Sequence, residues 1–184
     1  MVAVVERRGA WYAAAAIAVG AAVAVVLGGY GRTHQGNGQA IGGFTFGFPS
    51  LLQMKVWFAV AAGCLALIQL GTALWIYGRL GRPAPSWAGA LHRSTGTLAI
   101  LISLPVAANC LWALGFQTYS TRVLVHSVAG CLFYGAFVTK VLGLHRGSAP
   151  GWLVTLAGGL VFALLVTVVL TSSAWYLTAG SPGY

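Results

Sequence analysis

The feature that most constrains this chain is a series of long apolar segments that are almost free of charged residues. Each segment is close to the roughly 20 residues that an α-helix needs to cross a bilayer core of about 30 Å. Of the 184 residues, 59% are hydrophobic and 6% are charged, whereas a soluble globular domain carries roughly 25% charged residues. These observations exclude a soluble protein and predict an integral membrane protein.

Five such segments predict an all-α fold, a bundle of five transmembrane helices that forms a single membrane domain over residues 1–184. The predicted helices span residues 11–29, 51–78, 86–114, 122–144 and 152–177. A glycine-rich loop at residues 30–50 cannot lie exposed in hydrocarbon and is expected to fold back outside the membrane. Pro105 should kink the third helix. Five spans use roughly 110 positions, so the function must lie within the bundle.

The basic residues predict the orientation of the bundle. Ten Lys and Arg face a single acid, Glu6, which gives a formal net charge of +9. They stand singly at the ends of apolar segments and form no basic stripe, which argues against nucleic-acid binding. Most fall on one side of the predicted bundle: Arg7, Arg8, Arg79, Arg82, Arg93 and Arg146. We expect a protein of the bacterial inner membrane. The positive-inside rule then places its N-terminus in the cytoplasm and its C-terminus outside.

Two histidines within predicted spans are the leading candidates for chemistry, because ionisable side chains inside a membrane are costly and usually functional. His92 opens the sequence HRSTG and His126 opens HSVAG, so each is followed four residues later by a glycine, Gly96 or Gly130. Residues four apart share a helix face, and the glycine therefore leaves room for a flat macrocycle or for a closely packed helix. Structural histidines beside packing glycines are the alternative.

The depths of these histidines predict two sites rather than one. At a rise of about 1.5 Å per residue, His92 lies roughly 12 Å to the cytoplasmic side of its helix centre and His126 roughly 10 Å to the external side. Axial nitrogens on one iron stand only about 4 Å apart, given metal–nitrogen bonds of ~2 Å. His145, at the end of the fourth helix, falls within about one turn of His92 in depth and can complete an inner ligand pair.

The second ligand of the outer site is left open. Met54 and His34 are alternatives for this position beside His126, but neither spacing is diagnostic. Asn109 and Cys110 lie at a similar depth on the third helix.

Two basic residues flank the predicted inner site. Lys140 and Arg93 lie near the cytoplasmic surface, where they either neutralise the propionates of a haem or extend to the headgroups as anchors. No span contains Asp or Glu, which argues against carboxylate proton relays and hard-cation sites. No GxSxG, GxxxxGK or HExxH sequence occurs, and no catalytic residue is assigned.

These motifs resemble those of the small b-type cytochromes of the ferric-reductase-like transmembrane group, in which helix-borne histidines hold haem. The segment at residues 91–146, with NCLWALGF and HSVAGCLFYGAFVTK, also resembles a family of small uncharacterised bacterial multi-span membrane proteins. The first resemblance implies one or two b haems with iron ligands among His92, His126 and His145. With a haem on these histidines, the helix-face spacing and depth of Gly96, Gly130, Arg93 and Lys140 make them the expected haem contacts.

The sequence therefore predicts a membrane electron carrier, or a subunit of an oxidoreductase, that passes electrons across or along the bilayer. Its donor would be a quinone or a cytoplasmic-side donor, and its acceptor an external redox protein. Two other classes remain open, namely a cofactor-free accessory or scaffold subunit of a larger membrane complex, and a small transporter. A homo-oligomer is compatible with each.

Overall fold

The chain is all-helical in the computed structural model, which describes residues 2–34, 36–145 and 150–179. Five spans of the described chain are long and apolar enough to cross a membrane, and the predicted fold class is thereby confirmed. They cover Gly9–Thr33, Leu51–Ile76, Ala88–Leu114, Thr121–His145 and Gly151–Ala179.

The described helices group into two compact units. They are α1 (Val2–Thr33), α2 (Leu51–Ile76), α3 (Ala88–Asn109), α4 (Thr121–His145), α5 (Gly151–Val169) and α6 (Trp175–Ala179). A π-helical turn, Cys110–Leu114, prolongs α3, and a second, Leu170–Ala174, joins α5 to α6. One unit contains α1, α4 and α5 up to residue 168, and the other contains α2, α3 and the fifth span from residue 169.

The end of α1 lies at Thr33, beyond the expected end near residue 29. The sequence there is rich in glycine, but the last carbonyl groups of the helix find partners. The Thr33 hydroxyl donates to the Gly29 carbonyl at 3.0 Å, and the Gly31 carbonyl accepts the N–H of Phe116 at 2.6 Å. Because a helix end leaves several carbonyls without intrahelical partners, these contacts favour the extra turn.

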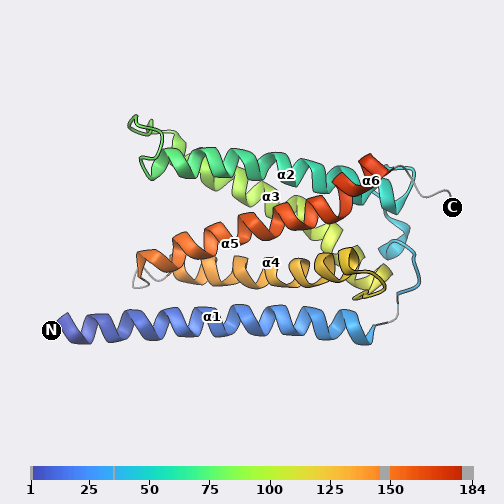
Figure 1. Ribbon diagram of the computed structural model, residues 1–184, viewed down its shortest axis with the longest axis horizontal. Helices are drawn as coiled ribbons and strands as arrows, with labels where there is room; N and C mark the ends of the chain where they lie inside the picture. Colours follow the sequence, from blue (N-terminus) through green and yellow to red (C-terminus); the bar gives the residue numbers. More distant parts are fainter. Residues whose placement is uncertain (1, 35, 146–149, 180–184) are drawn as a thin grey trace. The chain divides into compact units, whose positions relative to one another are not determined.

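Small residues allow α1 and α4 to run side by side (Figure 1). Gly20 of α1 faces Gly135 of α4 so closely that a Cβ on Gly135 would lie 2.5 Å from the Gly20 carbonyl oxygen. The Thr139 hydroxyl of α4 lies within hydrogen-bond distance of two carbonyls, that of Gly135 on its own helix at 3.0 Å and that of Ala16 on α1 at 3.3 Å. Lipid gives helices no hydrophobic reason to associate, so close packing and interhelical hydrogen bonds hold such pairs.

Residues 77–87 join α2 to α3, which pack against one another in the second unit (Figure 1). Trp75 near the end of α2 and Trp87 before α3 meet edge to face, with ring centroids 5.6 Å apart. The Trp75 indole N–H also donates to the Pro83 carbonyl at 3.2 Å. These contacts fix the turn between the two helices.

The segment between α1 and α2 folds back onto the end of α3. Asn109 is buried there, and its side-chain oxygen accepts the N–H of Ile41 at 3.0 Å while its amide donates to the Pro105 carbonyl at 2.9 Å. The Ala113 carbonyl accepts the N–H of Gly38 at 2.8 Å. Both the oxygen and the nitrogen of the Asn109 side-chain amide therefore form hydrogen bonds with main-chain groups.

Two reporters, alkaline phosphatase and green fluorescent protein, test the orientation. Fused after Ala179, the phosphatase is expected to be active and the fluorescent protein dark, because five spans separate this point from an N-terminus that positive charge retains in the cytoplasm. The same reporters fused after Arg82, in the turn between α2 and α3, should behave in the opposite way. Alkaline phosphatase activity and green fluorescence measure the two locations. Phosphatase activity at Arg82, or fluorescence at Ala179, would reverse the predicted orientation.

Candidate functional site

The predicted site residues are distributed over two helices, one in each unit. Those on α3 are His92, Arg93 and Gly96, and those on α4 are His126, Gly130, Lys140 and His145. His126 and His145 are 19 residues apart on one helix, which corresponds to about 28 Å at ~1.5 Å per residue. These two histidines therefore cannot bind one metal ion.

The ring of His92 is held by a threonine of the neighbouring helix. His92 is half-buried, and its Nδ1 atom lies 2.9 Å from the hydroxyl oxygen of Thr72 on α2. The same hydroxyl lies 2.8 Å from the Ile68 carbonyl oxygen, which can only accept. A hydroxyl has one proton to donate, so the donor and acceptor roles between Thr72 and His92 depend on the tautomer of the ring. In either case the contact orients the ring of His92 against α2.

The backbone at His92 is held by a second residue of α2. The side-chain amide of Gln69 donates to the His92 carbonyl and, at 2.6 Å, to the Thr95 hydroxyl. Thr95 in turn donates to the Leu91 carbonyl at 2.8 Å. A Cβ on Gly96 would lie 3.0 Å from the Gln69 side-chain oxygen. The glycine of the HRSTG sequence thus makes room for Gln69.

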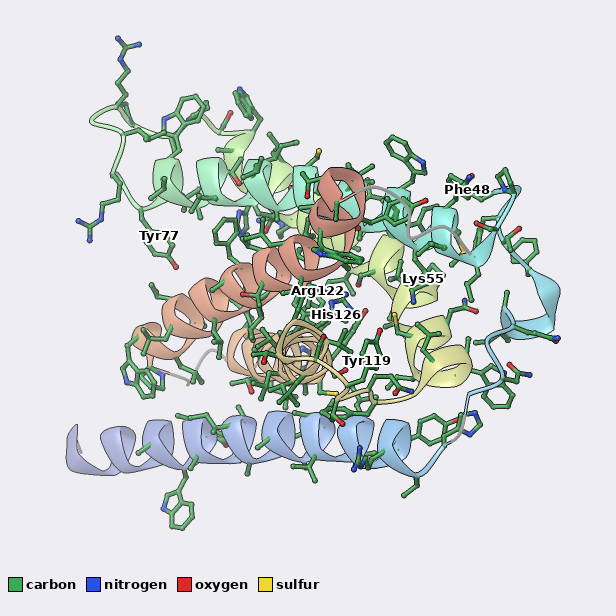
Figure 2. The ribbon with its side chains drawn as sticks, turned by 45° about the vertical axis from the view of Figure 1, so that its right-hand side comes forward. Phe48, Lys55, Tyr77, Tyr119, Arg122 and His126 are labelled. Carbon is green, nitrogen blue, oxygen red and sulfur yellow. The ribbon has the colours of Figure 1, made fainter. Side chains whose placement is uncertain are left out.

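His126 has a different environment. It is half-buried in the second turn of α4, one turn beyond Arg122 (Figure 2). A Cβ on Gly130, one turn further along, would meet no atom within 4 Å. Ala129 and Phe133 on the same helix are buried. The HSVAG sequence therefore leaves open space beside its glycine, whereas the equivalent space in HRSTG is filled.

The two basic candidates, Lys140 and Arg93, each have a side chain that lies close to a glycine. A Cβ on Gly158 of α5 would lie 3.8 Å from the Lys140 ammonium nitrogen, and a Cβ on Gly89 would lie 3.5 Å from the Arg93 guanidinium. Lys140 is half-buried and Arg93 is exposed. Because Lys140 lies 14 residues from His126, or about 21 Å along α4, it cannot contact a ligand bound close to that histidine.

The remaining candidate ligands have the following positions. The His34 ring stacks on Tyr30 with centroids 5.1 Å apart, His145 is the exposed last residue of α4, and Met54 is fully buried in α2. Cys110 is half-buried. Among the residues that the structure describes, no group of three or more His, Cys, Asp or Glu is gathered as a metal site.

Gln69 and Thr72 are the site residues that sequence reasoning missed. Both are polar side chains in a largely apolar span, three residues apart and therefore on one face of α2. Neither is ionisable, so a search of the spans for ionisable side chains passes over them. Their spacing is a signal, but it does not indicate which helix they face.

The described part of the chain thus defines a helical membrane protein with polar contacts concentrated around His92. A family model described as "Family of unknown function (DUF6529)" matches residues 13–182, and the chain belongs to this family. This agrees with the expected resemblance to small multi-span membrane proteins, and the matching model is not one of cytochromes. Neither the curated proteins nor the solved structures contain a match.

Proposed function

We propose that this protein is a membrane-embedded b-haem protein that carries electrons, with His92 and His126 as ligands to haem iron. The observation that carries the proposal is the hydrogen bond between His92 Nδ1 and the Thr72 hydroxyl, at 2.9 Å. Metal-bound histidines are almost always held by a hydrogen bond at their other ring nitrogen, which fixes the orientation of the ring.

The surroundings of His126 give independent support. Of the two glycines that follow these histidines, Gly130 has open space beside it for a macrocycle, whereas Gln69 fills the space beside Gly96. The spans contain no carboxylate that would compete for the imidazole protons. Two ligands from the protein complete the coordination of a haem iron, so a cluster of three or more ligands is not required.

The roles of the residues follow from their chemistry. A bound b haem supplies a one-electron redox couple whose potential depends on its ligands and their hydrogen bonds. His92 and His126 bind through imidazole, and the apolar spans around them exclude water. Arg93 and Lys140 are the candidates for positive charge at the haem carboxylates, Lys140 only for a haem bound away from His126, with His145 as the further ligand candidate. The donor is a quinone or a cytoplasmic-side donor, and the acceptor is an external redox protein.

An absorption spectrum of the purified protein tests the proposal. After expression with a haem precursor, we expect a Soret band that shifts on reduction by dithionite, and haem b in the pyridine haemochrome assay. A folded protein that remains colourless, and that takes up no haem in reconstitution, would overturn the proposal. It would instead favour a cofactor-free accessory subunit of a membrane complex.

A further inference from the structure

The segment between α1 and α2 carries three phenylalanines that pack along the first turns of α2. The rings of Phe46 and Phe48 contact the ring of Phe58 on α2, with centroids 5.3 and 5.6 Å apart. Phe44 packs on Phe46 at 4.5 Å, and Phe48 lies at the beginning of α2 (Figure 2). Residues 41–48 therefore lie alongside α2 and do not extend away from its end.

The position of Phe58 along α2 gives the depth of this segment in a bilayer. The span Leu51–Ile76 has 26 residues, or about 39 Å at ~1.5 Å per residue, which exceeds a hydrocarbon core of about 30 Å. With the middle of the span at the bilayer centre, Phe58 lies about 8 Å from that centre, well inside the ~15 Å half-thickness of the core. The rings of Phe46 and Phe48, which contact Phe58, therefore lie at the boundary between acyl chains and headgroups.

Several apolar side chains of the segment remain exposed at this depth. Phe44 is 61% exposed and Phe46 47%, although both rings pack on other rings, and Ile41 is 43% exposed. Leu52 and Trp57, in the first turns of α2, are exposed too, and on a membrane span such side chains contact lipid. The exposed surface of the segment thus continues the lipid-facing surface of α2.

The backbone of the segment suits the boundary rather than the core, because irregular backbone enters hydrocarbon only where its polar groups have partners. The N–H of Ile41 donates to the Asn109 side chain at 3.0 Å, and the N–H of Phe44 donates to the Ile41 carbonyl at 3.1 Å. The Phe48 N–H donates to the Thr45 carbonyl at 3.0 Å, and the Thr45 hydroxyl donates to the Phe48 carbonyl at 2.7 Å. These bonds lower the cost of bringing the segment close to lipid, and the first one ties it to the end of α3.

Phe46 is held in a strained conformation. Its φ of 52° lies in the left-handed region, where a bulky residue is an outlier and a glycine is not. Such strain persists only where the surroundings impose it, and here the rings of Phe44 and Phe58 hold the side chain of Phe46. An aromatic ring thus stands at a position where the backbone alone would favour glycine.

We infer that residues 41–48 form a membrane anchor, which inserts Ile41, Phe44 and Phe46 into the boundary between acyl chains and headgroups of the leaflet in which α2 begins. The partner of this surface is phospholipid and not another protein. Residues 33–54 contain no Asp, Glu, Lys or Arg, so no formal charge opposes the insertion. Apolar faces of interfacial segments are buried about 5–10 Å into this boundary. The anchor does not depend on haem binding.

A nitroxide spin label on Phe44→Cys tests the depth of the anchor in phosphatidylcholine nanodiscs. The background variant has alanine in place of the three native cysteines, Cys64, Cys110 and Cys131. Collisions of the label with oxygen report lipid, and collisions with a water-soluble nickel chelate report water. The lipid reference is Leu52→Cys on α2, and the water reference is Arg82→Cys in the turn between α2 and α3, both at exposed positions.

We expect the label at Phe44 to behave like that at Leu52, with access for oxygen and exclusion of nickel, and Ile41→Cys to give the same result. Access for nickel as high as at Arg82 would place the segment in water and overturn the inference. Exclusion of both reagents would also overturn it, because a protein surface would then cover the segment.

A second measurement needs no substitution and decides the inference if the cysteine variants do not fold. The unaltered protein is irradiated in nanodiscs that contain a phosphatidylcholine with a diazirine near the start of an acyl chain. Cleavage after Arg32 and Lys55 releases residues 33–55 as one peptide, and mass spectrometry locates the adducts. We expect adducts on residues 41–46 as well as on Leu52, which serves as the internal control. Adducts on Leu52 alone would overturn the inference.

Discussion

His92→Ala and His126→Ala are each expected to lower the haem content of the purified protein, and the double variant should contain almost none. An axial ligand lost from an apolar span is poorly replaced, because water has little access to the vacated position. His145 cannot substitute for His126, since about 28 Å of helix separates the two. The measurement is haem b per polypeptide by the pyridine haemochrome assay.

His34→Ala is the matched control for these variants. His34 lies just beyond α1, where its ring stacks on Tyr30, so its loss should leave the haem content unchanged. If both His92→Ala and His126→Ala retain full haem content, the ligand assignment is wrong. Loss in only one of the two variants would identify a single haem and its ligand.

Gly20→Val is expected to give the largest loss of stability among substitutions in the α1–α4 pair. A Cβ on Gly20 would overlap the Thr139 hydroxyl and the Gly135 carbonyl, so the two backbones must separate. Overpacking of this kind costs about 1–3 kcal/mol, and the separation also breaks the bond from Thr139 to the Ala16 carbonyl. Unfolding in mixed micelles with increasing SDS measures the change in the free energy of unfolding.

Gly29→Val provides the comparison on the same helix. A Cβ on Gly29 meets nothing within 4 Å, so the added side chain has space and the free energy of unfolding should change little. Equal stability of Gly20→Val and Gly29→Val would show that the contact with Gly135 does not hold α1 against α4.

The five spans could be predicted because bilayer thickness leaves few alternatives for long apolar segments. The pairing of α1 with α4, and of α2 with α3, could not be predicted in the same way. The contact depends on which of many glycines face each other, and Gly20 and Gly29 look alike in the sequence although only Gly20 lies against a neighbour. Hydropathy does not distinguish a lipid-facing glycine from a packed one.

The candidate site could also be predicted only in part, since the sequence gives the spacing of its residues but not their neighbours on other helices. The spacing of four residues between a histidine and a glycine marked His92 and His126 equally. The structure fills the space beside Gly96 with Gln69 and leaves that beside Gly130 open. A motif defines the order of residues along one helix, but the side chain that occupies the neighbouring space comes from another helix.

The pairing of α1 with α4 has a consequence for the order in which the protein assembles during synthesis. Ala16 and Thr139 are 123 residues apart, so at about 5–20 residues per second the ribosome needs about 6–25 s to supply the partner of α1. Gln69 and Thr95 are only 26 residues apart, which takes about 1–5 s at the same speed. The α2–α3 pair can therefore form while α1 is still a single helix in lipid. That helix is stable there because its backbone groups are satisfied internally, and the face around Gly20 stays covered by acyl chains until α4 displaces them.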